Sequence, residues 1–188
     1  MIKVKGNVRV LKSIIGAVCI VVVFIAIATI FMHVEKVKKE AVNNLKNVGV
    51  AQSTIVDKQA IKTSLENIRP YENKLLNTVV DKKAQTEKFN NRKIAIKEYL
   101  ADLSNYAKEV SEYSAAVSKI NCTNEVNTYK SNVLNECSNF ETGLQHEINF
   151  VNNKDTNEMN AASSCYQNFI NIYSSNKTVY QNVVNLCK

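Results

Sequence analysis

The pattern of apolar and polar positions divides the chain into an apolar run near its start and a long amphipathic remainder. Residues Ile14 to Met32 are 19 consecutive positions without a charged residue or a proline. A helix of about 20 apolar residues crosses the hydrocarbon core of a bilayer. The pattern therefore predicts a transmembrane helix over 14–32, preceded by a short basic tail over 1–13.

Beyond the run, apolar residues recur three or four positions apart, which is the spacing of an amphipathic helix, and no segment alternates as a strand would. We expect an all-α fold, in which the transmembrane helix continues as a helical stalk over 33–69. The apolar stripe lapses around Lys58 and Lys62, so the stalk is not a strong coiled coil. Because proline is tolerated in the first turn of a helix, Pro70 is expected to begin a new helix and a helical-bundle ectodomain over 70–188.

Three further amphipathic segments have similar lengths. They predict helices over about 92–120, 123–151 and 155–187. Helices of similar length that are joined by short connections pack antiparallel as neighbours. We therefore expect an antiparallel bundle in which residues 70–88 form the fourth member.

Local signals mark the ends of these helices. Thr123 is expected as an N-cap, and Asp155 with Glu158 three residues later fits a capping box. The apolar stripe fades around Asn90, and we expect a break there, because one unbroken helix from Pro70 would outrun the stalk and carry charged residues into the bilayer. The alternative is that Pro70 only bends the chain.

Four of the five cysteines lie after the apolar run: Cys122, Cys137, Cys165 and Cys187. An even number in a small exported domain suggests two disulfides. Cysteines of one helix cannot pair, since Cys122 and Cys137 would lie about 22 Å apart along the axis. Folding the last two helices back at residues 152–153 favours the nested pairs Cys137–Cys165 and Cys122–Cys187, which would staple a C-terminal hairpin. Such pairs imply an oxidising compartment; four reduced core cysteines are the alternative.

Basic residues flank the apolar run unequally. Lys3, Lys5, Arg9 and Lys12 precede it, and Lys36, Lys38 and Lys39 follow it. The positive-inside rule then predicts a cytoplasmic N-terminus and an extracytoplasmic C-terminal domain, in the periplasm or at the cell exterior. A signal peptide cleaved after Ala28 is the alternative, but three more apolar residues follow Ala28 after Thr29, which favours an uncleaved signal-anchor.

The formal net charge of +7 does not by itself indicate a nucleic-acid partner. Four of the basic residues lie in the first 12 positions, and the rest of the chain holds 20 basic and 17 acidic residues. We expect no nucleic acid to bind. One basic stretch is a candidate interaction surface, although a solvated turn is the simpler interpretation. It comprises Lys82, Lys83, Lys88, Arg92, Lys93 and Lys97.

No pattern of catalytic residues stands out in the chain. The two histidines are His33, next to the apolar run, and His146, between Gln145 and Glu147. No glycine-rich phosphate loop, metal-spaced ligand set or nucleophile elbow accompanies them. We therefore expect no enzymatic activity, no cofactor and no metal.

The architecture favours a function exerted through protein–protein contacts. A single membrane anchor carrying a helical bundle is typical of an accessory or scaffold subunit of a cell-envelope assembly for export, conjugation or phage functions. Its partners would be other envelope proteins or further copies of itself. The alternatives are a ligand-binding or sensory ectodomain that signals through a partner, and a viral surface or entry protein.

Overall fold

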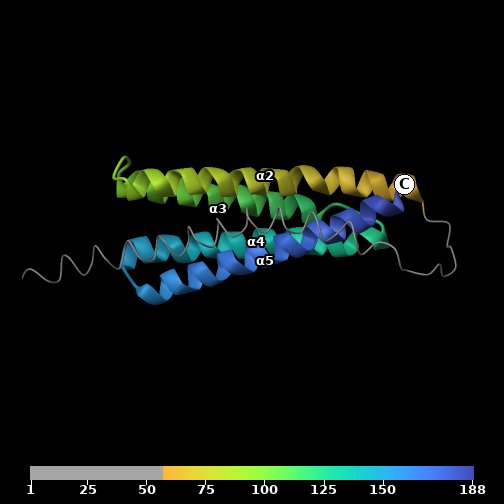
Figure 1. Cartoon of the computed structure of the whole chain (residues 1–188). Helices are drawn as coiled ribbons and strands as arrows, with labels where there is room; N and C mark the ends of the chain where they lie inside the picture. Colours follow the sequence, from red (N-terminus) through yellow and green to blue (C-terminus); the bar gives the residue numbers. More distant parts are fainter. Residues whose placement is uncertain (1–56) are drawn as a thin grey trace, which may run out of the picture. The chain divides into compact units, whose positions relative to one another are not determined.

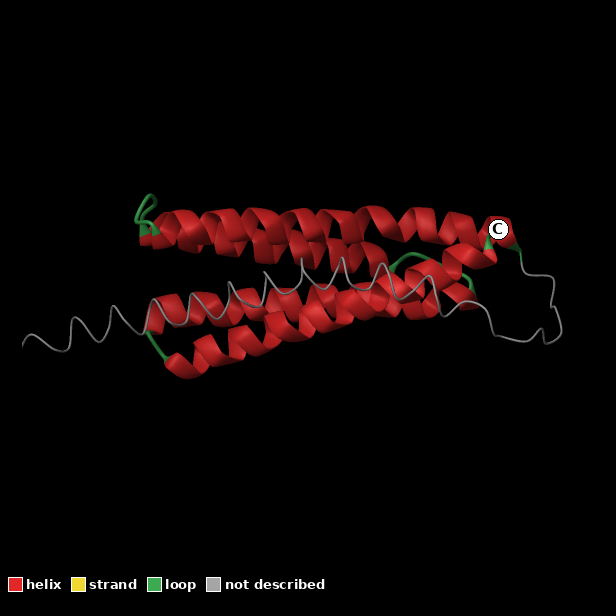
Figure 2. Cartoon of the chain, viewed as in Figure 1, coloured by secondary structure: helices red, strands yellow, loops and turns green. Residues whose placement is uncertain are grey.

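The structure, a computed structural model, describes residues 57–188, which form four helices and no strand. The helices are α2 (Lys58–Asn90), α3 (Ile96–Ser118), α4 (Asn124–Asn153) and α5 (Thr156–Leu186). They lie side by side, and each runs in the opposite direction to the one before it (Figure 1). Short loops connect them (Figure 2). The expected all-α bundle is thus confirmed for this part of the chain.

The predicted tail over 1–13, the transmembrane helix over 14–32 and most of the stalk over 33–69 lie outside the described residues. Within 57–188, none of the helices is long and apolar enough to cross a membrane.

Helix α2 begins twelve residues before Pro70, so the expectation that a new helix starts at Pro70 is wrong. The Asp57 carboxylate caps it by accepting from the Ala60 N–H at 3.0 Å. Pro70 lies in the helix interior but on its exposed face. Proline cannot donate to the carbonyl of Glu66, one turn earlier, and water can reach that carbonyl on this face.

The first turns of α2 belong to the bundle rather than to a separate stalk. Ile61, Leu65 and Ile68 are almost fully buried. They lie in one apolar cluster with Val126 and Val133 of α4. The part of the expected stalk that the structure describes therefore contributes to the hydrophobic core.

The break expected near Asn90 is confirmed. Helix α2 ends at Asn90, and the Asn91 N–H donates to the Glu87 carbonyl at 3.0 Å. Arg92 adopts a left-handed conformation with φ 56°, which turns the chain back toward α3. A positive φ is uncommon for a residue with a side chain, so this turn has a defined geometry.

The turn between α4 and α5 closes the C-terminal hairpin. Lys154 is left-handed, with φ 60°, and ends α4. The Asp155 carboxylate accepts from the Asn157 N–H at 2.9 Å, as expected of an N-cap. Glu158 does not complete the capping box, because its carboxylate bonds His146 of α4 at 2.7 Å. Thr123 occupies the N-cap position of α4, but its hydroxyl makes no capping hydrogen bond.

Helix α4 is the centre of the bundle, since it packs most extensively against α5 and α3. Two apolar clusters fill the interior. The first holds Leu75, Tyr99, Leu103, Val110, Cys137, Phe140, Leu144, Val151 and Phe169. The second holds Ile61, Leu65, Ile68, Val117, Val126, Tyr129, Val133 and Val183. Polar side chains separate the two clusters.

Close contacts fix the register of the α4–α5 hairpin. The Phe140 and Phe169 rings lie 5.4 Å apart between centroids, and those of Tyr129 and Tyr180 also lie 5.4 Å apart. Moving one residue toward the C-terminus of α4 therefore corresponds to moving one residue toward the N-terminus of α5. Gly143 fits the same register, because a Cβ there would come within 2.6 Å of the Tyr166 ring.

This register places the four cysteines, all of which are free thiols in the structure. Counted on past the first residue of α4, the same register assigns Cys122 to the level of Cys187, but the described cysteines form no disulfide and none lies at disulfide distance from another. Cys137 comes opposite residue 172, about seven residues or 10 Å along α5 from Cys165. A disulfide needs Cα atoms within about 7 Å, so the nested pair Cys137–Cys165 is wrong for this packing.

Candidate functional site

The predicted basic surface lies partly at the turn between α2 and α3, at the opposite end of α2 from its first residue (Figure 1). Lys88, Arg92, Lys93 and Lys97 are all exposed there, and we call these four residues the basic turn. The backbone N–H groups of Arg92 and Lys93 donate back into the end of α2 at 3.0 and 2.8 Å. The basic turn therefore presents its cations from a hydrogen-bonded backbone.

The ring of Phe89 attaches this turn to the core. It stacks on Tyr99 with centroids 4.4 Å apart and planes 3° from parallel. Tyr99 is itself buried. The end of α2 and the start of α3 are thereby held together directly beneath the exposed cations.

Lys82 does not belong to the surface that the sequence suggested. Its side chain is buried, and its Nζ lies 2.8 Å from Glu147 Oε2 in α4. The ammonium also lies 4.6 Å from the centroid of the Tyr166 ring. Lys83 is only partly exposed. Of the six predicted residues, the structure thus brings four together at the surface and places one in the core.

Glu147 is the centre of a hydrogen-bonded cluster within the core. The hydroxyls of Tyr99 and Tyr166 donate to its two carboxylate oxygens at 2.5 and 2.6 Å. Burial alone would raise the pKa of the Glu147 carboxyl, but the Lys82 ammonium and the two hydroxyls hold that pKa below its ordinary value. The carboxylate is therefore charged and paired, and the cluster joins α2, α3, α4 and α5.

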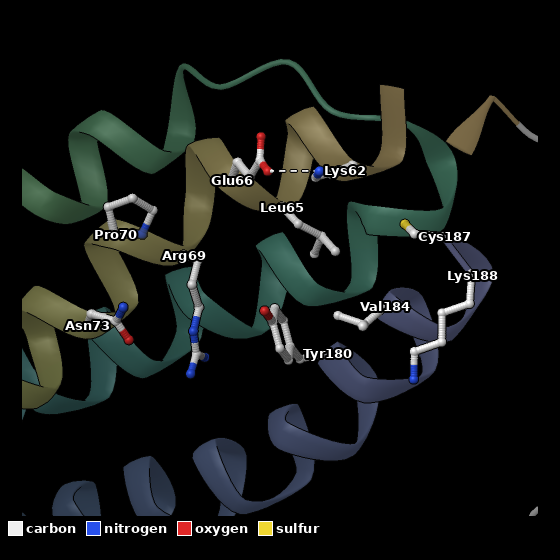
Figure 3. Close-up of a pocket in the computed structure, with 10 residues that line it drawn as sticks. All are labelled: Lys62, Leu65, Glu66, Arg69, Pro70, Asn73, Tyr180, Val184, Cys187 and Lys188. Atoms are coloured by element: carbon white, nitrogen blue, oxygen red, sulfur yellow. Dashed lines mark ion pairs between the residues drawn. The ribbon is translucent and has the colours of Figure 1, made fainter. Parts of the chain in front are cut away.

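A groove of about 540 Å³ opens between α2 and the end of α5 (Figure 3). Its lining combines apolar and charged side chains: Lys62, Leu65, Glu66, Arg69, Pro70, Asn73, Tyr180, Val184, Cys187 and Lys188. The Arg69 guanidinium lies 4.6 Å from the centroid of the Tyr180 ring, a cation–π distance. Lys62 and Glu66 form an exposed ion pair at 3.8 Å. The groove can therefore accept a molecule with an apolar part and a polar or anionic part.

Behind the groove, a polar layer separates the two apolar clusters. Its buried members are Glu72 of α2, Glu136 of α4 and Asn176 of α5, exposed by 1%, 0% and 0%. Arg69 reaches from the groove wall to form an ion pair with Glu72. The Tyr129 hydroxyl also donates to Glu72, at 2.7 Å.

The Asn176 amide connects the two carboxylates of this layer. Its Nδ2 donates to Glu136 Oε1 at 2.9 Å and to Glu72 Oε1 at 3.2 Å. The other oxygens, Glu136 Oε2 and Asn176 Oδ1, are buried without a hydrogen-bond partner. Burial, with the nearby Glu72 charge, raises the pKa of Glu136 to about 8. Glu136 is thus largely protonated at neutral pH.

Sequence reasoning missed this layer, because acidic residues in an amphipathic helix are usually assigned to the solvent face. A signal was available in the spacing. Asn176 lies seven residues after Phe169 and seven before Val183, both of which are buried. An interval of seven keeps residues on one face of a packed helix.

The structure also places His146, which the sequence left without a partner. Its Nδ1 lies 2.7 Å from Glu158 Oε2, across the α4–α5 turn. Within residues 57–188, no three His, Cys, Asp or Glu side chains are grouped as metal ligands would be.

Comparison with known proteins gave no match: no family model, curated protein or solved structure is significantly similar to this chain.

Proposed function

We propose that this protein is a single-pass, membrane-anchored helical module of a cell envelope that acts by binding other proteins. The basic turn is the observation that carries the proposal. Residues 87–98 hold four basic and two acidic residues, and the turn is exposed at the end of a compact bundle. A fixed cluster of like charges steers and orients an oppositely charged partner surface.

The apolar run from Ile14 to Met32 supports the membrane anchor, because its length matches a bilayer core. With the N-terminus in the cytoplasm, the bundle would stand outside the inner membrane, in the periplasm or at the cell exterior. The partner would be an acidic surface on another envelope protein, as expected for a scaffold or accessory subunit of an export, conjugation or phage-related assembly. A viral surface protein would use the same design.

Charge reversal at the basic turn tests the proposal in the native host. Membranes containing the full-length protein are crosslinked and affinity-purified, and the captured proteins are identified by mass spectrometry. We expect the wild type to capture defined partners and the triple variant R92E/K93E/K97E to lose them.

The matched control for this experiment is K58E/K108E/K119E, which makes the same change in net charge at three exposed lysines elsewhere on the bundle. The control should capture the same partners as the wild type. Equal capture by all three proteins would overturn the role of the basic turn, and capture of no other envelope protein would overturn the scaffold function.

An oxidising compartment would link Cys122 to Cys187 in this proposal. The packing of both residues against the second apolar cluster supports the pair, and its formation would require the free thiols of Cys122 and Cys187 to move together. Oxidation would release two thiol protons and pass two electrons to a thiol–disulfide oxidoreductase of the envelope. Alkylation of unreacted thiols in intact cells, followed by non-reducing peptide mapping, should recover this linkage. Two alkylated cysteines would contradict the compartment.

A second candidate is a ligand-binding ectodomain that signals through a partner, and the groove between α2 and α5 is the observation that favours it. A ligand that binds only the folded state raises its stability by mass action. Small molecules from the host are therefore screened for an increase in melting temperature. The increase should disappear in the Tyr180→Ala variant, and an unchanged increase there would exclude the groove.

A further inference from the structure

The polar layer in the middle of the bundle depends on a single amide. Asn176 is the only buried polar residue that α5 contributes to the described core. Both hydrogens of its Nδ2 are used, one on a carboxylate of α2 and the other on a carboxylate of α4. The contact between α5 and the other two helices at this level therefore depends on the state of those two carboxylates.

The charges of the layer do not balance when both carboxylates are ionised. Among residues 57–188, Arg69 is the one cation within ion-pair distance of either carboxylate, and it pairs with Glu72. Glu72 also accepts from Tyr129, whereas Glu136 accepts from Asn176 alone. A buried carboxylate without a cation is strongly destabilising, so the protein can keep the layer closed by leaving a proton on Glu136.

The groups around the layer leave one carboxylate charge uncompensated, and a single proton on Glu136 would neutralise it. The titratable or charged groups that face Glu136 or Glu72 are Arg69 of α2, Tyr129 and Cys137 of α4, and Tyr173 of α5. Burial raises the pKa of the Cys137 thiol and of the Tyr173 phenol, so both are neutral near pH 7. Helix α3 contributes the buried apolar residues Val110 and Val117 on either side of this level.

We propose that the Glu72–Asn176–Glu136 layer is a proton-operated latch, in which a proton on Glu136 holds α5 against α2 and α4 and its loss loosens α5. Deprotonation places two carboxylates on one amide, with only Arg69 to compensate them. The charge is relieved when water enters from the groove lined by Arg69 and Tyr180, because Arg69 connects that groove to Glu72. The latch therefore links the acidity of the compartment to the opening of the groove.

The direction of the pH effect follows from linkage. In the folded chain the Glu136 carboxyl binds its proton more tightly than in the unfolded chain, because the folded pKa is about 8 and the ordinary value is about 4.3. Its contribution to stability is thus fully present at acidic pH, declines as pH rises from about 4.3 to about 8, and stays constant above that.

Amide hydrogen exchange on the full-length protein in detergent micelles tests the latch. Exchange is followed for residues 170–186 of α5 at about pH 6 and about pH 9 and corrected for intrinsic rates. We expect the protection of this segment in the wild type to fall at least tenfold at the higher pH. In the Glu136→Gln variant, whose amide stays neutral and still accepts from Asn176, protection should not depend on pH.

Two further measurements make the outcome decisive. The Glu112→Gln control removes an exposed carboxylate of α3 and should keep the wild-type pH dependence. The infrared stretch of a protonated carboxyl in the wild type should persist at neutral pH and vanish toward pH 9, which tests the latch even if Glu136→Gln does not fold. Protection of α5 that does not change with pH in the wild type would overturn the proposal, as would loss of the protonated-carboxyl signal below pH 6.

Discussion

Gly143 occupies the closest approach between α4 and α5, and a single methyl group there should destabilise the protein. A Cβ at this position would lie 2.6 Å from the Tyr166 ring. The ring cannot easily yield, since its hydroxyl is bonded to Glu147. Alanine gains about 1 kcal/mol in helix propensity, and overpacking costs about 1–3 kcal/mol. We therefore expect Gly143→Ala to lower the free energy of unfolding by up to about 2 kcal/mol in chemical denaturation.

A double-mutant cycle identifies the contact behind this effect. Tyr166→Leu removes the ring that the new methyl group would meet. In that background, Gly143→Ala should become neutral or stabilising. An equal loss in both backgrounds would show that the glycine is required for another reason.

The buried ion pair between Lys82 and Glu147 supplies the second residue-scale prediction. Lys82→Met keeps most of the apolar stem but leaves the Glu147 carboxylate buried without its cation. Breaking such a pair on one side typically costs about 3–5 kcal/mol. We expect a loss of this size at pH 7, and a smaller loss at about pH 5, because a carboxyl without its cation can be protonated there.

Replacing both partners is the control for this prediction. The double variant Lys82→Met/Glu147→Gln removes both charges and keeps an acceptor for the tyrosine hydroxyls. It should be more stable than Lys82→Met alone at pH 7. A double variant that is less stable would mean that the methionine, rather than the unpaired charge, disrupts the core.

The residue scale is where reasoning from the sequence was least complete. Lys82 was assigned to a basic surface because its neighbours in sequence are basic, whereas its position on the buried face of α2 decides its environment. Glu136 was not selected because it precedes Cys137 on the apolar stripe and resembles an ordinary flanking charge. Burial of a polar group depends on what the other helices place opposite it, and the helical period of one segment does not contain that information.

At the scale of elements, α2 should be limited in stability by the proline in its interior. A proline in the interior of a helix costs about 3 kcal/mol relative to alanine, and it returns about 0.4–1 kcal/mol by restricting the unfolded chain. We expect Pro70→Ala to raise the free energy of unfolding by about 2 kcal/mol, because the Glu66 carbonyl regains its donor. The matched control Asn73→Ala, exposed on the same helix, should change stability by less than about 0.5 kcal/mol. A Pro70→Ala variant that is less stable than the wild type would contradict this prediction. It would show that alanine does not restore an ordinary helical hydrogen bond to the Glu66 carbonyl.

Helix ends were predicted well where a local hydrogen bond determines them. Asp155 accepts from the backbone at the start of α5, and the turn after Asn90 begins where the apolar stripe fades. Pro70 misled the prediction, since a proline on an exposed helix face can be accommodated when packing on the opposite face is strong. The buried residues Ile61, Leu65 and Ile68 provide that packing.

At the scale of the whole molecule, the number and antiparallel order of the last three helices followed from their similar lengths and short connections. The register of the hairpin did not follow, because the turn lies at Lys154 and Asp155 rather than at residues 152–153. The displacement of the turn changes the position of opposed residues on both helices, so the register between α4 and α5 shifts by twice as many residues. It moves Cys137 and Cys165 out of register, whereas it brings Cys122, which precedes α4, nearer to the level of Cys187 when residues are counted from the turn.

The outer cysteine pair therefore gives a prediction for the whole bundle. A disulfide between Cys122 and Cys187 would close a loop of about 65 residues, and the loss of entropy in the unfolded chain would stabilise the fold by about 4 kcal/mol. For a chain of this size we expect the melting temperature of the oxidised full-length protein in micelles to exceed that of the reduced protein by roughly 10 °C.

Cys122→Ser should abolish the difference, because the remaining thiol has no partner at its level. Cys165→Ser should preserve it, since Cys165 is out of register with the other cysteine of its expected pair. Loss of the difference in Cys165→Ser would show that α5 is shifted by about two turns against α4, and would overturn the register on which both the groove and the polar layer depend.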